Sequence, residues 1–147
     1  MENMIDHHAM AVHMGEMCLA KAVHQELRAM CQEIVTSQQQ EIATMQQWLN
    51  AWYGIANYQP EMTPGHMNQM EKMSMLSGAE FEIEFMQMMI RHHRMAVVKG
   101  SQCIARAYHD ELQDMCTDIV TTQLAEIKQM EEWLCNWYGM CRPRQRQ

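Results

Sequence analysis

Residues 4–54 read MIDHHAMAVHMGEMCLAKAVHQELRAMCQEIVTSQQQEIATMQQWLNAWYG, and residues 89–139 read MIRHHRMAVVKGSQCIARAYHDELQDMCTDIVTTQLAEIKQMEEWLCNWYG. The two segments align without a gap, and more than half of the aligned positions carry the same residue. A chain that repeats such a segment builds one supersecondary unit twice, and each copy covers the apolar face of the other. The repeat therefore predicts two similar halves that share a core.

Each repeat has the pattern of two helices joined by a short turn. Residues of one stripe recur at steps of three and four in the first repeat, as in a helix with one buried face: Ile5, His8, Val12, Gly15, Leu19 and Ala22. The pattern restarts near His24 and near His109, and the repeats end at Gly54 and Gly139, which suit helix C-caps. Two such hairpins predict an all-α fold, a four-helix bundle.

A chain of 147 residues predicts one domain, because this length can bury a single core without a partner. The expected parts of the domain 1–147 are the first repeat (4–54), a linker rich in methionine and histidine (55–79), the second repeat with its lead-in (80–139) and a tail (140–147). Prolines and glycines mark the linker, in which we expect about two turns of helix.

The six cysteines are placed symmetrically about the predicted turns. The expected disulfides are Cys18 with Cys31, Cys103 with Cys116, and Cys135 with Cys141. The first two pairs straddle a turn at equal distances, so their members face one another in an antiparallel hairpin. Three disulfides indicate an oxidising compartment. The alternative is free thiolates that bind metal in a reducing cytosol, and the absence of C-x-x-C disfavours it.

The composition and the motifs argue against several classes of function. The formal net charge is -7 and the only basic run is the tail RPRQRQ, so we expect no nucleic-acid partner. Apolar runs fall well short of the roughly 20 residues that cross a bilayer, so we expect no membrane span. Glu-x-x-His, H-E-x-x-H and G-x-S-x-G are absent, so we expect no catalytic residues and no enzyme.

Two counts stand out, 19 methionines and 8 histidines. Helical spacing places Met10, His13, Met14 and Met17 together on one face, nearly opposite the apolar stripe. The second repeat has lysine and glutamine at the positions of Met14 and Met17, and these residues suit solvent. We therefore expect this face to be exposed, to bind metal and to be replaceable with little loss of stability. Ordinary surface variation is the alternative.

Further candidate ligands lie near the His-His pairs and in the linker. They are Met4, His7, His8, Met88, Met89, His92, His93 and Met95, and in the linker His66, Met67, Met70 and Met73. His8 and His93 fall on the core stripe, so satisfied core histidines are an equally good interpretation of those two. For the linker we expect a mobile arm that captures metal, with a lid packed on the bundle as the alternative.

A set of thioether and imidazole donors selects a soft metal. Methionine sulfur is a neutral, soft ligand that favours Cu(I) and its analogue Ag(I), while imidazole accepts several transition metals. Calcium or magnesium would need clustered carboxylates, and the chain has no D-x-D-x-D loop. The sequence therefore predicts binding of Cu(I), with Ag(I) as its analogue.

The repeated M-I-x-H-H-x-x-M-A-V, followed by I-V-x-x-Q-x-x-E-I-x-x-M-x-x-W-L, resembles a bacterial family of ferritin-like domains long labelled as of unknown function. The resemblance covers nearly the whole chain except the linker and the tail. It implies a four-helix bundle in the periplasm that binds Cu(I) or Ag(I) and contributes to copper tolerance, without a known catalytic step. It also implies His7, His8, His92 and His93, with neighbouring methionines, as ligands. Family members usually have more residues before the first His-His pair, so we expect a shortened front.

We expect a periplasmic protein that binds Cu(I) for sequestration, transfer and resistance, although the sequence has no signal peptide. Its expected partners are copper ions and a copper efflux pump or another copper carrier. Two alternatives stay open. A copper-dependent redox enzyme, such as a cuprous oxidase, would turn over Cu(I) with oxygen. A helical interaction module would bind a partner protein through its methionines.

Overall fold

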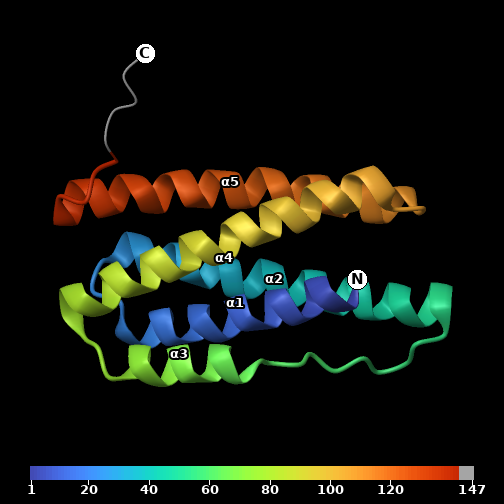
Figure 1. The fold of residues 1–147 in the computed structure, drawn as a ribbon, viewed down its shortest axis with the longest axis horizontal. Coiled ribbons are helices and arrows are strands. Elements are labelled where there is room, and N and C mark those ends of the chain that lie inside the picture. Colours follow the sequence, from blue (N-terminus) through green and yellow to red (C-terminus); the bar gives the residue numbers. More distant parts are fainter. Residues whose placement is uncertain (143–147) are drawn as a thin grey trace, which may run out of the picture. The chain divides into compact units, whose positions relative to one another are not determined.

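The structure is a computed structural model that describes residues 1–142. Figure 1 shows its helices, which are α1 (Glu2–Lys21), α2 (Gln25–Tyr53), α3 (Pro64–Ser74), α4 (Gly78–Arg106) and α5 (Asp110–Tyr138). These described residues contain no strand, so the predicted all-α class is confirmed. Among the same residues, no helix has the length and apolar character that a membrane crossing requires.

The chain divides into two compact units, Met1–Phe85 and Met86–Gln147. The first unit contains α1, α2, α3 and the start of α4, and the second contains the rest of α4 and α5. Each unit therefore holds one of the two predicted hairpins. The prediction that both belong to one domain stays a prediction.

Both hairpins turn where the sequence predicts, at residues 22–24 and 107–109. α2 and α5 end at Gly54 and Gly139, whose φ angles of 67° and 69° lie in the left-handed region. A residue with a Cβ is strained in that conformation, whereas glycine adopts it freely. The two glycines therefore end the second helix of each repeat, as expected.

All six cysteines form the predicted disulfides. The bridges that cross the hairpins, Cys18–Cys31 and Cys103–Cys116, join Cα atoms 6.2 Å and 6.1 Å apart. The third bridge, Cys135–Cys141, ties the segment after α5 back to that helix. No cysteine is a free thiol, so thiolates are not available as metal ligands in this oxidised form.

The two helices of each hairpin approach closely at a glycine. A Cβ added to Gly15 would lie 2.8 Å from Val35 Cγ2, and one added to Gly100 would lie 2.7 Å from Val120 Cγ2. Non-bonded carbon atoms prefer a separation of about 3.5–4.0 Å. Each glycine therefore leaves the space into which a valine of the partner helix packs.

Gly15→Ala is expected to lower the free energy of unfolding by about 1 kcal/mol, the balance of two effects. Overpacking costs about 1–3 kcal/mol, and Val35 cannot easily swing aside because its χ1 is restricted. Alanine recovers about 1 kcal/mol of helix propensity over glycine. Gly65→Ala is the matched control, since a Cβ there has no neighbour closer than 4.0 Å. Urea unfolding compares the two variants, and equal stability of both would contradict the close approach.

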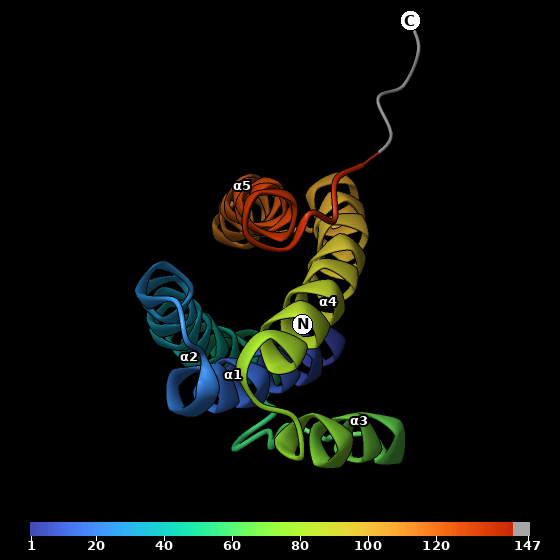
Figure 2. The ribbon, with the colours of Figure 1, turned by 90° about the vertical axis from the view of Figure 1, so that its left-hand side faces the viewer.

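The predicted linker contains a helix that packs against α1. α3 begins at a regular N-cap, where Thr63 Oγ1 accepts a hydrogen bond from the His66 N–H at 3.1 Å and Pro64 follows at the first helical position. Figures 1 and 2 both show α3 alongside α1. The expectation of a mobile arm is therefore wrong, and the alternative of a packed lid describes this segment.

Polar contacts hold the segment to α1 on both sides of α3. Before the helix, Asp6 Oδ1 accepts hydrogen bonds from the Tyr58 hydroxyl at 2.9 Å and from the Glu61 N–H at 3.0 Å. After it, Lys21 Nζ donates to the Leu76 carbonyl oxygen. Burial, together with the Asp6 carboxylate, raises the pKa of Tyr58 to about 12, so the phenol remains a donor at neutral pH. These contacts fix where α3 lies along α1.

The face of α1 opposite its apolar stripe is covered. Met14 is 1% exposed, and Met10, His13 and Met17 are half-buried. The prediction that these four side chains face water is wrong, because a helical wheel of α1 alone does not include α3. The described part of the second unit has no helix that corresponds to α3, and Met95, the counterpart of Met10, is 55% exposed there.

Candidate metal centre

α3 lies alongside α1 (Figure 2), and His13 of α1 contacts His66 of α3. Seven of the predicted donors fall on the two helix faces that contain these histidines. They are Met10, His13, Met14 and Met17 from α1, and His66, Met70 and Met73 from α3. The three donors of α3 follow the i, i+4, i+7 spacing of one helix face, and their exposed fractions are only 6%, 3% and 0%. We call these seven residues the α1/α3 cluster.

Two imidazoles meet inside this cluster. His13 Nδ1 lies 3.2 Å from His66 Nε2, and the ring centroids are 5.3 Å apart. Two imidazole nitrogens that bind one ion in a tetrahedral arrangement, each at about 2.0 Å, lie about 3.3 Å from one another. The observed distance of 3.2 Å is close to this value, and it is also that of an N–H···N hydrogen bond. Without metal, one ring donates its N–H to the other, so at least one ring is neutral.

The electrostatics of His66 also suit a ligand. Burial, and to a smaller extent the neighbouring His13, lowers the pKa of the His66 imidazole. The ring is therefore neutral at pH 7, and neutral imidazole is the form that binds metal.

In the metal-free protein, the docking of α3 is expected to weaken as the pH falls below about 6.5, the ordinary histidine value. His66 has its lowered pKa only while α3 is docked, so the undocked form binds more protons between the two pKa values and acid favours it. Methyl NMR of Met70 and Met73 should show shifts toward exposed methionine at pH 5.5 but not at pH 7.5. His66→Gln should reduce this dependence, and an unchanged spectrum of the parent protein at both pH values would contradict it.

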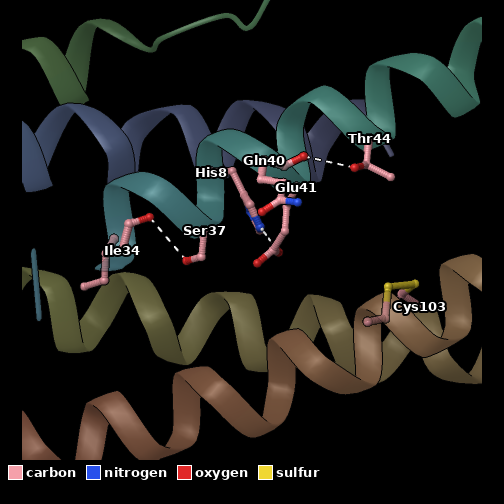
Figure 3. Close-up of polar contacts among 8 residues, drawn as sticks. His8, Ile34, Ser37, Gln40, Glu41, Thr44 and Cys103 are labelled. Atoms are coloured by element: carbon pink, nitrogen blue, oxygen red, sulfur yellow. Dashed lines mark hydrogen bonds and ion pairs between the residues drawn. A yellow bond between two sulfur atoms is a disulfide. The ribbon is translucent and has the colours of Figure 1, made fainter. Parts of the chain in front are cut away.

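A different imidazole environment recurs in the two units. His8 Nε2 lies 2.8 Å from Glu41 Oε2 (Figure 3), and His93 Nε2 lies 2.5 Å from Glu126 Oε2. An ionised carboxylate can only accept a hydrogen bond, so Nε2 is the donor, and in the neutral tautomer of each ring Nδ1 keeps a lone pair. Both rings are fully buried, and Nδ1 has no hydrogen-bond partner among the described residues.

These two histidines are thus satisfied at one nitrogen only. A carboxylate that fixes the tautomer of a histidine is the usual outer partner of a metal ligand. Gln38 Oε1 and Gln123 Oε1 are also buried without a hydrogen-bond partner in the described structure. Each unit therefore buries acceptor atoms where a proton donor or a cation would be stabilised.

The other predicted ligands are more dispersed. Met4, His7, Met88 and Met89 are buried, His92 is half-buried, and Met67 and Met95 are 48% and 55% exposed. The exposed pair lies outside the α1/α3 cluster. Within residues 1–142, no group of three or more His, Cys, Asp or Glu side chains is arranged to hold a metal ion. The further donors among the predicted ligands are methionine thioethers.

Glu41 and Glu126 are not among the site residues predicted from the sequence. A signal for them exists, because His8 and Glu41 are as symmetric about the first turn as Cys18 and Cys31 are, and the second repeat has the same relation. Each glutamate lies as far after its turn as its histidine lies before it, and the same equal spacing predicts the disulfides across the hairpins. Both carboxylates could therefore have been predicted in the same way.

The model of a family described as Domain of unknown function (DUF305) matches residues 1–134. No curated protein matches the chain in sequence.

Solved structures extend the likeness over nearly the whole chain. CopM in the Cu(I)-bound form is 34% identical, with a TM-score of 0.82 and 94% of each chain covered. CopM in the Ag-bound form, obtained by co-crystallization, is 35% identical with the same TM-score and coverage. A DUF305 protein from Streptomyces coelicolor is 23% identical with a TM-score of 0.82, covers 98% of this chain and 94% of its own, and shows the fold alone. The predicted fold class is thus confirmed as CopM-like and all-helical.

Proposed function

The chain belongs to the DUF305 family, and from this premise we propose that it binds Cu(I), with Ag(I) as its analogue, for copper sequestration, transfer and resistance. CopM has been solved with Cu(I), Cu(II) and Ag bound, and its 33–36% identity to this chain supports a copper-binding role here. Copper is the cargo in this proposal, and no catalytic step is assigned.

The observation that carries the proposal is the meeting of His13 and His66 among methionines of two helices. The 3.2 Å between their ring nitrogens suits a shared ion. Thioether sulfur is soft and uncharged, so it favours Cu(I) or Ag(I) over Zn²⁺ and over hard cations. Burial of Met14, Met70 and Met73 excludes water that would compete for the ion.

The thiol chemistry supports an oxidising compartment, and we propose the periplasm. All six cysteines are in disulfides, as is usual outside the reducing cytosol. Thioethers need no deprotonation and cannot be lost to disulfide formation, so they stay available there. Release of the ion requires α3 to move off α1, and we propose that this happens on handover to an efflux pump or another copper carrier.

Native mass spectra of the disulfide-bonded protein titrated with Ag(I) test the proposal. The test variant carries leucine at Met10, Met14, Met17, Met70 and Met73. The control variant carries leucine at five exposed or half-buried methionines elsewhere, Met30, Met62, Met75, Met115 and Met140. Leucine keeps the apolar volume and removes the sulfur, so both variants should fold.

The parent and the control should bind at least one Ag(I) ion more than the test variant, and no thiol should alkylate. Equal binding by all three proteins would refute the α1/α3 cluster as the site. Steady oxygen consumption with excess Cu(I) would instead favour a cuprous oxidase.

A further inference from the structure

The second unit has a pocket of about 360 Å³ between α4, α5 and the segment after α5. Its floor is apolar and includes Ile90 and Leu134, and its rim carries three arginines, Arg91, Arg94 and Arg142. The only acidic residue among the residues that line it is Glu131. The pocket is thus locally positive in a chain whose formal net charge is -7.

Glu131 neutralises only part of this charge. Its Oε1 lies 2.9 Å from Arg94 Nη2 and 2.5 Å from Arg142 Nη2. One carboxylate thus serves two guanidinium groups, and Arg91 is exposed on the same rim. Each guanidinium has five N–H donors, so donors are left for an acceptor in the pocket.

The first unit shows what occupies the same place in the other repeat. There the counterpart of Arg91 is Asp6, which accepts hydrogen bonds from the Tyr58 hydroxyl and the Glu61 N–H. The counterpart of Glu131 is Gln46, whose side-chain amide donates to the Tyr58 carbonyl oxygen at 2.8 Å. Residues 55–61, a segment without helix or strand, therefore contact this site in the first repeat through Tyr58 and Glu61.

The second repeat keeps the site and reverses its chemistry. The apolar floor is conserved between the repeats, with Ile5 and Leu49 matching Ile90 and Leu134. The first repeat has an acceptor at this position, Asp6, and binds groups that donate hydrogen bonds. The second repeat has a donor, Arg91, and therefore suits an anionic group that accepts them. Residues 143–147, PRQRQ, add two arginines and no acid, so these five residues lack the complementary charge.

We propose that this pocket binds an extended acidic segment of a partner protein, with carboxylates on the arginines and an apolar side chain on the floor. Guanidinium groups recognise carboxylates in a bidentate manner, which gives such a contact geometric specificity. Arg91 and Arg94 bracket His92 and His93 in one turn of α4, so the partner would dock beside the second His-His pair.

Fluorescence anisotropy of a fluorescein-labelled peptide, Glu-Tyr-Glu-Ile-Glu with blocked ends, tests the inference on the metal-free full chain. The neutral peptide Gln-Tyr-Gln-Ile-Gln is the matched probe. Arg91→Ala/Arg94→Ala should weaken binding of the acidic peptide by at least about tenfold, because the charged pairs at its carboxylates are lost. Arg106→Ala removes an exposed arginine outside the pocket and should change nothing.

Glu131→Gln provides a gain of function that a misfolded variant would not give. The substitution frees Arg94 and Arg142 from their ion pairs with Glu131 and should tighten binding of the acidic peptide. Added NaCl should weaken binding of this peptide to the parent protein. Equal affinity for both peptides, no effect of the double alanine variant, or equal competition by inorganic phosphate at matched ionic strength would overturn the proposal. A concentration-dependent dimer that the double variant abolishes would assign the pocket to a second copy of the chain, and would overturn it as well.

Discussion

Alanine at both His13 and His66 is expected to weaken binding of the first Ag(I) ion by at least about tenfold, which is the smallest loss usual even for an outer partner of a metal ligand. His13 and His66, with ring nitrogens 3.2 Å apart, are the only two imidazoles in the α1/α3 cluster. After their removal only the thioethers of the cluster are left to hold the ion. Competition titration against a chromophoric Ag(I) chelator measures the change in affinity.

His109→Ala is the matched control, because it removes an imidazole from the second unit, outside the cluster. It should leave the affinity for the first ion unchanged. Far-UV circular dichroism before metal addition separates loss of ligands from loss of helix. Parent-like affinity in a fully helical His13→Ala/His66→Ala protein would show that the ion binds elsewhere, and the half-satisfied His8 and His93 would be the next sites to test.

The hairpins were predictable because their determinants are local or symmetric. The turns, the glycine caps and the disulfides depend on spacing within one repeat. The Cys18–Cys31 disulfide confirms the position of the first turn without any use of hydropathy. The same symmetry contains the His8–Glu41 contact. Sequence therefore specified each hairpin, including a polar contact inside it.

The cluster could not be placed fully because α3 lies outside the repeat. The wheel of α1 identified Met10, His13, Met14 and Met17 as one face, and the second repeat suggested that this face was exposed. That comparison failed because only the first unit has a helix over it, within the part of the chain that the structure describes. Docking of a segment 53 residues away, as in the contact of His13 with His66, leaves no periodic signal in α1.

Alanine at Glu82 is expected to cost about 3 kcal/mol of stability, an amount typical of one hydrogen bond to a charged group together with the donors left behind. Glu82 is fully buried at the start of α4. Its Oε2 accepts the N–H groups of Val23 and His24 at 2.8 Å each, and its Oε1 lies 2.6 Å from His24 Nδ1.

This carboxylate binds the N–H groups of the turn just before α2 begins. His24 is the N-cap residue, and its own side chain makes no capping hydrogen bond. A negative group is also favoured there by the helix dipole. Loss of Glu82 would therefore leave donors of the turn unsatisfied and remove the polar link from α4 to the first hairpin.

Glu82→Gln keeps an acceptor of the same shape and should cost less than half as much as Glu82→Ala. Glu80→Ala, at an exposed position in the first turn of the same helix, should cost less than about 1 kcal/mol. Urea unfolding followed by circular dichroism orders the three variants. If Glu82→Ala were no less stable than Glu80→Ala, water would be replacing the carboxylate at no cost. The contacts of Glu82 would then not be what joins α4 to the turn between α1 and α2.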